Sequence, residues 1–203
     1  MENRSQAVWI DNSLSEFRHC PIGVPQGSNL GPLFFLVFYN DLPFSVSHCA
    51  IDAYADDSTL TVSANSTEII GDQLTEDCGT VAEWMVGNKL QLNAEKTHLM
   101  TVGTGARLRI QTDKVSAHMA GVELKESPDG CEKLLGCCIE PHLKWQKQID
   151  SLLNRLQLRL NALEHLRSMV PVRIKKQIVE GIFNSVLVYC LPLFGGMGVG
   201  SVR

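Results

Sequence analysis

The segment Tyr54-Ala55-Asp56-Asp57 is the most informative stretch of the chain, because two adjacent carboxylates interrupt a run of apolar and small residues. The flanking runs, 50–53 and 58–62, have the β-branched and alternating character of strands. We expect a strand, a two-residue turn and a second strand over about 49–63, with the aspartates at the tip. Hard oxygen ligands of this kind suit Mg²⁺ or Mn²⁺, and a shared cation would offset the repulsion between them. The alternative is a solvated Asp-Asp turn without chemistry.

A second segment, Gly23-Val24-Pro25-Gln26-Gly27-Ser28, is predicted to be a rigid loop punctuated by glycine and proline. Ser28 or Asn29 can cap the segment that follows it, and Pro32 suits a first helical turn. The run from 30 to 42 is almost wholly apolar, so a buried helix is expected over about 29–40.

Together, the two segments resemble the reverse transcriptase family, specifically the type encoded by non-LTR (LINE-type) retrotransposons. In that family a GVPQGS-type loop opens a helix, and after a spacer a Y-x-D-D hairpin carries metal ligands. Here 27 positions separate Gly27 from Tyr54. Two later blocks, 84–97 and 134–145, also resemble the family, so that the likeness covers about 8–193.

The resemblance implies a role for each matched residue. Asp56 matches a metal ligand that neutralises charge on the incoming triphosphate, and Asp57 matches its neighbour. Lys96 matches a lysine that protonates the leaving pyrophosphate, although an exposed lysine at a strand start is the alternative. The positions that match the template and nucleotide segments are Pro25, Gln26, Gly27 and Tyr54, and those that match the primer-supporting turn are Leu135 and Gly136. The family's usual residues are replaced at Cys137-Cys138 and Glu140-Pro141.

A polymerase palm needs carboxylates from two strands, since two ions are clamped about 4 Å apart. In the family the other strand lies well upstream of the Pro-Gln-Gly loop, whereas 22 residues precede Gly23 here. The aspartate among them, Asp11, belongs to Asp11-Asn12-Ser13, a typical turn for a hairpin over about 6–20. We therefore expect an N-terminally truncated palm that is not a self-sufficient enzyme. It would bind Mg²⁺ or Mn²⁺ only when the other ligand is supplied.

Charge is distributed unevenly along the 203 residues. The formal net charge of −4 is unusual for a free nucleic-acid binder. However, eight Lys or Arg and two Asp or Glu lie between Lys144 and Lys176, the segment that resembles a thumb. Lys147, Arg155 and Arg159 are therefore expected to contact the nucleic-acid backbone. A solvated helix face is the alternative.

The expected fold class is α+β. A partial palm, an antiparallel sheet backed by helices, is expected at 1–142, and a thumb-like helical segment with a tail at 143–203. Further helices are expected over about 66–87, 144–167 and 172–190, and strands at 97–102, at 108–110 and between 119 and 139. The second of these helices has an apolar stripe of Ile149, Leu152, Leu153, Leu156, Leu160 and Leu163.

The seven cysteines form no metal-binding spacing with the six histidines. An odd count without a signal peptide predicts reduced thiols and an intracellular protein of the nucleus or cytoplasm. The uncharged segment 181–202 is interrupted by polar residues, proline and glycine, so no membrane-spanning helix is expected.

The expected function is RNA-directed DNA polymerase by descent, with an RNA template, a DNA primer and dNTP as partners. Another chain that supplies the missing half of the palm is a further expected partner. Two alternatives remain: a domesticated remnant that binds nucleic acid or protein without chemistry, and an element fragment with no selected role. A sheet without its central partner strand would expose backbone edges and apolar surface.

Overall fold

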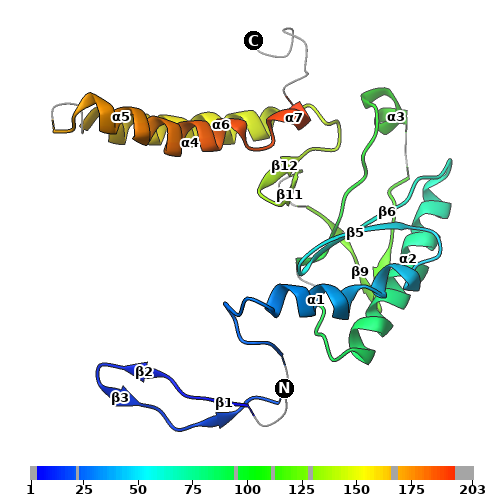
Figure 1. The fold of residues 1–203 in the computed structure, drawn as a ribbon. Coiled ribbons are helices and arrows are strands. Elements are labelled where there is room, and N and C mark those ends of the chain that lie inside the picture. The colour runs from blue at the N-terminus through cyan, green and yellow to red at the C-terminus, as the bar shows by residue number, and fades with distance from the viewer. Residues whose placement is uncertain are drawn as a thin grey trace.

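The structure is a computed structural model that describes residues 4–21, 23–93, 96–110, 113–127, 130–165 and 169–194. Helices and short strands share these ranges, as the mixed α and β class predicts (Figure 1). Within the described ranges the strands pair into six sheets of two strands each. No described sheet has a third strand, so each strand keeps one edge without a described partner strand.

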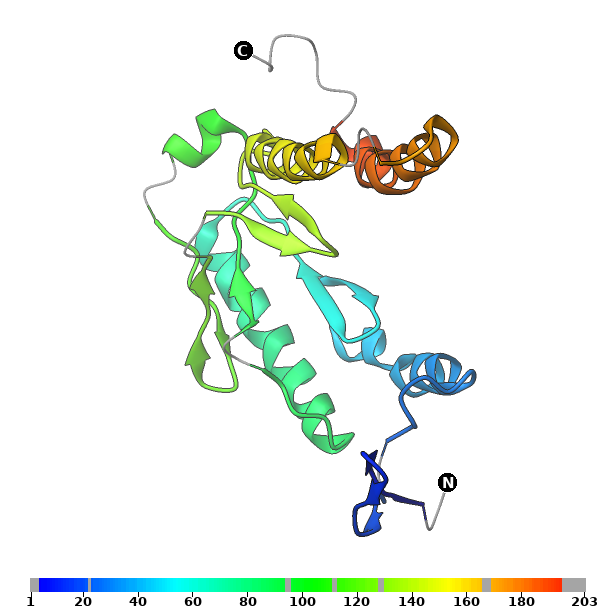
Figure 2. The same cartoon turned by 90° about the vertical axis from the view of Figure 1, so that its left-hand side faces the viewer.

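The N-terminal ribbon contains β1 (Ser5–Gln6), β2 (Trp9–Ile10), β3 (Ser13–Leu14) and β4 (Arg18–His19). β1 pairs with β4 and β2 with β3, both antiparallel, so the hairpin predicted over about 6–20 is confirmed. Asp11 and Asn12 form its turn, with φ values of 46° and 62° that suit a two-residue hairpin loop. Figures 1 and 2 both place this ribbon at the periphery, away from the other sheets.

Helix α1 (Gly31–Tyr39) follows the GVPQGS loop and leads into the 3₁₀ turn η1 (Leu42–Ser45). The prediction of a helix here is confirmed, but the prediction that it is buried is wrong, because only Gly31 and Tyr39 of its nine residues are buried. Only its C-terminal end meets α2, where Phe38 and Tyr39 contact Trp84. Its exposed large side chains are Leu33, Phe34, Leu36, Val37 and Phe38.

Strands β5 (Ala50–Tyr54) and β6 (Asp57–Thr61) form the hairpin predicted over about 49–63. Helix α2 (Thr67–Gly87) confirms the helix predicted over 66–87 and runs beside the hairpin in Figure 2. The buried apolar residues form two clusters, one of Tyr39, Leu42, Cys78, Val81 and Met119 and the other of Cys49, Leu74, Leu99, Val115 and Ala117. Since both clusters include residues of α2, this helix organises the core.

The next segment contains β7 (His98–Leu99), α3 (Gly105–Ile110), β8 (His118–Met119), β9 (Val122–Glu123) and β10 (Lys125–Glu126). β8 and β9 form a hairpin, and β7 pairs in parallel with β10. The strand predicted at 108–110 is wrong, because these residues end helix α3. The run 106–109 consists of good helix formers, and the backbone N–H of Leu108 donates to the Thr104 carbonyl at 3.0 Å.

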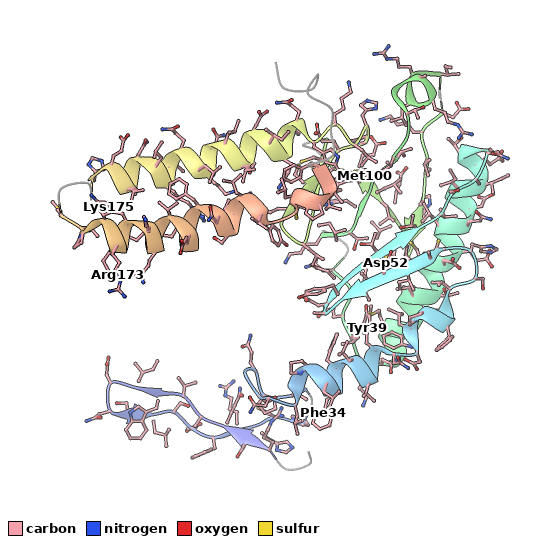
Figure 3. The ribbon with its side chains drawn as sticks, turned by 45° about the horizontal axis from the view of Figure 1, so that its top comes forward. Phe34, Tyr39, Asp52, Met100, Arg173 and Lys175 are labelled. Carbon is pink, nitrogen blue, oxygen red and sulfur yellow. The ribbon has the colours of Figure 1, made fainter. Side chains whose placement is uncertain are left out.

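The last sheet joins β11 (Glu132–Leu134) to β12 (Cys137–Ile139). After it come α4 (Gln146–His165), α5 (Val172–Ile178), the π-helical segment η3 (Val179–Asn184), α6 (Ser185–Val188) and α7 (Leu191–Phe194). In Figures 1 and 3, α4 lies side by side with the rod formed by α5, η3 and α6. The helices predicted over 144–167 and 172–190 are confirmed within the described residues, the second with a π-helical interruption. Residues 166 and 167 lie outside the described ranges.

The apolar stripe predicted on α4 is only partly correct. Leu152 is buried and Ile149, Leu156 and Leu163 are half-buried, whereas Leu153 and Leu160 are exposed. Among the described residues, α4 packs against the rod and against β12, and these neighbours leave part of the stripe exposed. The rod from α5 to α6 has no buried residue.

All seven cysteines lie within the described residues and are free thiols. No helix in the described ranges is both long and apolar enough to cross a membrane.

Candidate functional site

The β5–β6 hairpin presents the two aspartates at its tip. Ala55 and Asp56 form the turn, and Tyr54 pairs with Asp57 across it. Ala55 has a φ of 55°, a left-handed conformation that few non-glycine residues adopt. Both aspartates are exposed, and neither is used by any ion pair of the described residues. The tip therefore offers two unengaged carboxylates on a constrained turn.

The two faces of the hairpin differ in chemistry. Side chains alternate along a strand, and directly paired residues share a face. Asp52, Tyr54 and Asp57 consequently point to one face, where all three are exposed. Ile51 and Leu60 point to the other face and pack against the core cluster around Tyr39.

Helix α1 is tied directly to this hairpin. The Tyr39 hydroxyl lies 2.5 Å from Oγ of Ser58, the residue that follows Asp57. The Tyr39 ring stacks on Phe35 at 5.2 Å and meets Trp84 edge-on at 5.5 Å between ring centroids. The helix that begins after the GVPQGS loop therefore ends against the strand that carries the second aspartate.

The GVPQGS loop itself is exposed and locally ordered by backbone hydrogen bonds. The backbone N–H of Ser28 donates to the Pro25 carbonyl at 3.1 Å, which closes a turn around Gln26 and Gly27. Gly27 has a φ of 80°, so a side chain at this position would be strained. Pro25, Gln26 and Gly27 are all exposed and available to a partner.

Lys96 is on a different segment from the aspartates, just before β7. It is exposed in a turn before β7, where its backbone N–H donates to the Asn93 carbonyl at 3.2 Å. Among the described residues, no hydrogen bond or ion pair joins Lys96 to Asp56 or Asp57. Nδ1 of the nearby His98 lies 3.2 Å from Oε1 of Glu132 at the start of β11. The segment after Lys96 is thus linked to the β11–β12 hairpin.

Leu135 and Gly136 form the β11–β12 turn, with φ values of 48° and 80°. The Tyr189 hydroxyl, from the end of the rod, donates to the Leu135 carbonyl. The backbone N–H of Cys138 donates to Oε1 of Gln148, a buried side chain of α4, at 2.9 Å. The predicted primer-supporting turn is therefore held by both helical elements that follow it.

The predicted backbone-contacting residues fall into two groups. Lys147 and Arg155 are exposed on α4. Arg159 is half-buried, and its Nη1 donates to the Ile182 carbonyl of η3, so it joins the two helical elements. Arg173 of α5, which was not among the predicted residues, points away from α4 in Figure 3.

The sequence profile described as "Reverse transcriptase (RNA-dependent DNA polymerase)" matches residues 4–161. The chain belongs to the reverse transcriptase family. This match includes the GVPQGS loop, the β5–β6 hairpin and the β11–β12 hairpin. It ends within α4, before the rod that holds the Leu135 turn.

Curated reverse transcriptases of mobile elements are similar over most of the chain. The chain is 28% identical over 205 residues to a "Probable RNA-directed DNA polymerase from transposon BS" of Drosophila melanogaster. It is 26% identical over 204 residues to the "RNA-directed DNA polymerase from mobile element jockey" of Drosophila funebris. Each alignment covers 96% of this chain but only 22% of the relative. The chain thus spans about a fifth of the length of the curated relatives that it matches.

These findings confirm the resemblance to reverse transcriptases of the non-LTR type. No solved structure matches the chain. The reverse transcriptase profile does not by itself assign a role to any side chain, so the roles implied for the matched residues stay predictions.

The donor chemistry at the tip of the hairpin fits a divalent cation, because Asp56 and Asp57 supply hard carboxylate oxygens that are exposed and unengaged. Within the described ranges, no group of three or more His, Cys, Asp or Glu residues is arranged to hold a metal ion. Asp56 and Asp57 are thus two exposed carboxylates for which the described residues arrange no third ligand of this kind.

One residue that bears on the site was missed by the sequence analysis. Asp77 of α2 is completely buried and accepts hydrogen bonds from the backbone immediately before β5. Its spacing from Leu74 and Val81, three and four residues away, places it on the buried stripe of the helix. An aspartate on such a stripe is the signal that would have identified it.

Proposed function

We propose that these residues form the metal-bearing part of an RNA-directed DNA polymerase palm, followed by thumb-like helices. The observation that carries the proposal is the exposed, constrained Asp56-Asp57 tip, in a chain whose family match includes this hairpin. The proposed palm part spans 1–142 and the thumb-like part 143–203. The proposed partners are an RNA template, a DNA primer and dNTP.

Asp56 is the proposed metal ligand, and Asp57 assists it. Bound Mg²⁺ or Mn²⁺ would supply charge neutralisation at the triphosphate and activation of the attacking oxygen. The chain's own contribution is to hold the carboxylates at a fixed place. The Tyr39–Ser58 hydrogen bond and the left-handed Ala55 support that role, because both restrict the turn.

The remaining matched residues would surround the reacting groups. Gln26 and Gly27 would lie against the templating base and the incoming nucleotide, with Pro25 and Tyr54 beside them. Lys96 would donate a proton to the leaving pyrophosphate. This role requires Lys96 to approach the site when nucleic acid is bound, because in the structure it has no contact with the aspartates.

Leu135 and Gly136 would support the primer strand, while Lys147 and Arg155 would contact phosphates. Phosphate contacts are electrostatic and are therefore weakened by salt. Arg159 contributes differently in this proposal, since its guanidinium already binds the Ile182 carbonyl. It would maintain the spacing of the thumb-like helices.

The 203 residues by themselves are proposed to be inactive. A two-metal site needs carboxylates from a second strand, and the described residues do not gather three ligands. The exposed apolar side of α1 and the edges of β5 and β6, which no other strand of the described ranges pairs with, support a complement from another segment or chain. That complement would cover the apolar surface and add the remaining ligand.

Metal binding tests the first part of the proposal. Paramagnetic Mn²⁺ is expected to broaden the NMR amide signals of residues 54–58 before those of other exposed acidic segments. Asp56→Asn is expected to remove this selective broadening, and Asp72→Asn, a change at an exposed aspartate of α2, to leave it intact. Absence of selective broadening in the parent protein, or its persistence in Asp56→Asn, would contradict the proposed metal ligand.

Binding of an RNA–DNA hybrid duplex at several salt concentrations tests the second part. Replacement of Lys147 or Arg155 by glutamine is expected to weaken binding and to reduce the salt slope by about one for each lost phosphate contact. Lys125→Gln, on exposed strand β10, is the matched control. Hybrid binding without metal binding at Asp56 would favour the alternative of a non-catalytic binding protein.

A further inference from the structure

Asp77 is the acidic residue that is completely buried in the described part of the chain. Its Oδ1 accepts the backbone N–H of Ser47 at 2.9 Å. Its Oδ2 accepts the backbone N–H groups of His48 at 2.9 Å and of Cys49 at 2.6 Å. One carboxylate of α2 therefore satisfies three consecutive amides of the segment that leads into β5.

These hydrogen bonds keep the Asp77 carboxylate charged inside the protein. Burial acts to raise its pKa, but the donors from Ser47, Cys49 and His48 outweigh burial and hold the pKa below its usual value. The pKa of the neighbouring Cys49 thiol is shifted in the opposite direction. Burial, followed by its hydrogen bond to Asp77, raises the pKa of Cys49 to about 12.

The three amides that Asp77 binds directly precede β5, the strand that leads to the proposed metal site. β5 begins at Ala50, directly after Cys49, and reaches the Ala55-Asp56 turn about 17 Å further on, at 3.4 Å for each strand residue. The other strand is held separately by the bond from Tyr39 to Ser58. Each strand of the hairpin is therefore tied to a different helix.

These two contacts fix the register in which β5 pairs with β6. A slip of one residue would reverse the facing of every side chain in a strand. In β5 it would turn Asp52 and Tyr54 toward the core and expose Ile51. No third strand holds the hairpin in the described ranges, so its register depends on the turn and on these side-chain contacts.

We infer that Asp77 is a positioning residue for the Asp56-Asp57 turn, acting through the backbone at 47–49 and the register of β5. It does not touch the metal or the substrate. The inference rests on the proposed function, since the place of the turn matters for chemistry only if Asp56 binds a metal ion.

Two measurements on the full chain test this role. Asp77→Asn keeps the size of the side chain but leaves at least one of the three N–H groups without an acceptor. Asp72→Asn makes the same change in charge on the exposed side of α2. Ser47→Pro removes a single donor and leaves α2 unchanged; Val46, with a ψ of 146°, already has the extended backbone preferred before proline.

Hydrogen exchange is the first readout. Asp77→Asn is expected to speed exchange of the amides at 47–61 about tenfold relative to the amides of α2, as loss of a buried hydrogen bond implies. Ser47→Pro is expected to act in the same direction with a smaller effect, and Asp72→Asn to have none. If exchange rates rise equally over α2 and the hairpin, Asp77 only stabilises the protein as a whole, and the inference is overturned. If Asp77→Asn does not fold, the same comparison of exchange rates at 47–61 and in α2 is made with Ser47→Pro.

Affinity for Mn²⁺ at residues 54–58 is the second readout. A positioning role predicts about tenfold weaker binding in Asp77→Asn, at the lower end of losses seen when ligand-orienting groups are removed. Unchanged affinity would overturn the role of Asp77. If the parent protein binds no Mn²⁺ at this turn, the proposed function fails, and the exchange experiment still decides whether Asp77 holds the hairpin.

Discussion

The hydroxyl of Tyr39 and Oγ of Ser58 lie 2.5 Å apart, so helix α1 and strand β6 meet at the residue that follows Asp57. The GVPQGS loop and the Y-x-D-D segment belong to separate elements, and this hydrogen bond joins those elements. The same tyrosine is buried in the core cluster with Leu42 and Val81. A core residue thus connects the apolar interior to the proposed metal-bearing hairpin.

Tyr39→Phe is expected to lower the free energy of unfolding by about 1 kcal/mol, because it leaves the Ser58 hydroxyl without its partner while the ring contacts remain. Urea unfolding measures the change. Tyr54→Phe, at an exposed position of the same hairpin, serves as the control and is expected to have little effect. A double-mutant cycle with Ser58→Ala isolates the pair, and a coupling energy near zero would contradict the contact.

Gly71→Ala is expected to destabilise the protein by about 1–3 kcal/mol, the usual penalty for overpacking. A Cβ at Gly71 would lie 2.4 Å from the Ser116 carbonyl oxygen. Gly79→Ala, elsewhere on α2, has no atom within 4 Å of the added Cβ and is expected to stabilise the helix by about 0.5–1 kcal/mol. Equal effects of the two substitutions in urea unfolding would show that α2 does not pack on the 115–117 segment.

Leu135→Asn is expected to stabilise the β11–β12 hairpin by about 0.5–1 kcal/mol, because asparagine tolerates a φ of 48° better than leucine. Gly136→Ala is expected to have the opposite sign, since its φ is 80°. Thermal unfolding of both variants measures the two changes in stability. A destabilising Leu135→Asn would indicate that the leucine side chain contributes packing that outweighs the turn strain.

The hydrogen bonds between Asp77 and the backbone at 47–49 predict a specific loss of stability in acid. The pKa of Asp77 is lower in the folded protein than in the unfolded chain, where it is about 3.9. The stability that it contributes is therefore complete above about pH 4 and is lost as the pH falls through the lower folded value. Asp77→Asn should be less stable than the parent at pH 6, and the difference should narrow toward pH 3. Asp72→Asn should not show this pattern in urea unfolding.

The hairpins were predictable from sequence because their signals are local. Asp11-Asn12 is a strong turn signal, and Ala55-Asp56 lies between two runs with strand character. Helix α2 was predictable for the same reason, since its apolar spacing extends over many residues. The resemblance to reverse transcriptases was also carried by short, contiguous motifs.

The sequence predictions that were wrong or missing concern features that depend on contacts between distant segments or on short segments. The apolar composition of α1 predicted burial, but among the described residues only Gly31 and Tyr39, at its two ends, are buried. The 105–110 segment is too short for its periodicity to separate strand from helix. The position of Asp77 on the apolar stripe of α2 was a signal in the sequence, but its partners are three backbone amides 28 to 30 positions away, and these could not be identified from the sequence.

The most direct test of the central claim is primer extension on an RNA template with a DNA primer in Mg²⁺. The 203 residues should be measured alone and together with a polypeptide that carries the family's upstream palm strand, with Asp56→Asn alongside. We expect no extension by the chain alone, and extension after complementation that Asp56→Asn abolishes. Extension by the chain alone would contradict the need for a second carboxylate strand, and extension that survives Asp56→Asn would contradict the metal-bearing role of the hairpin.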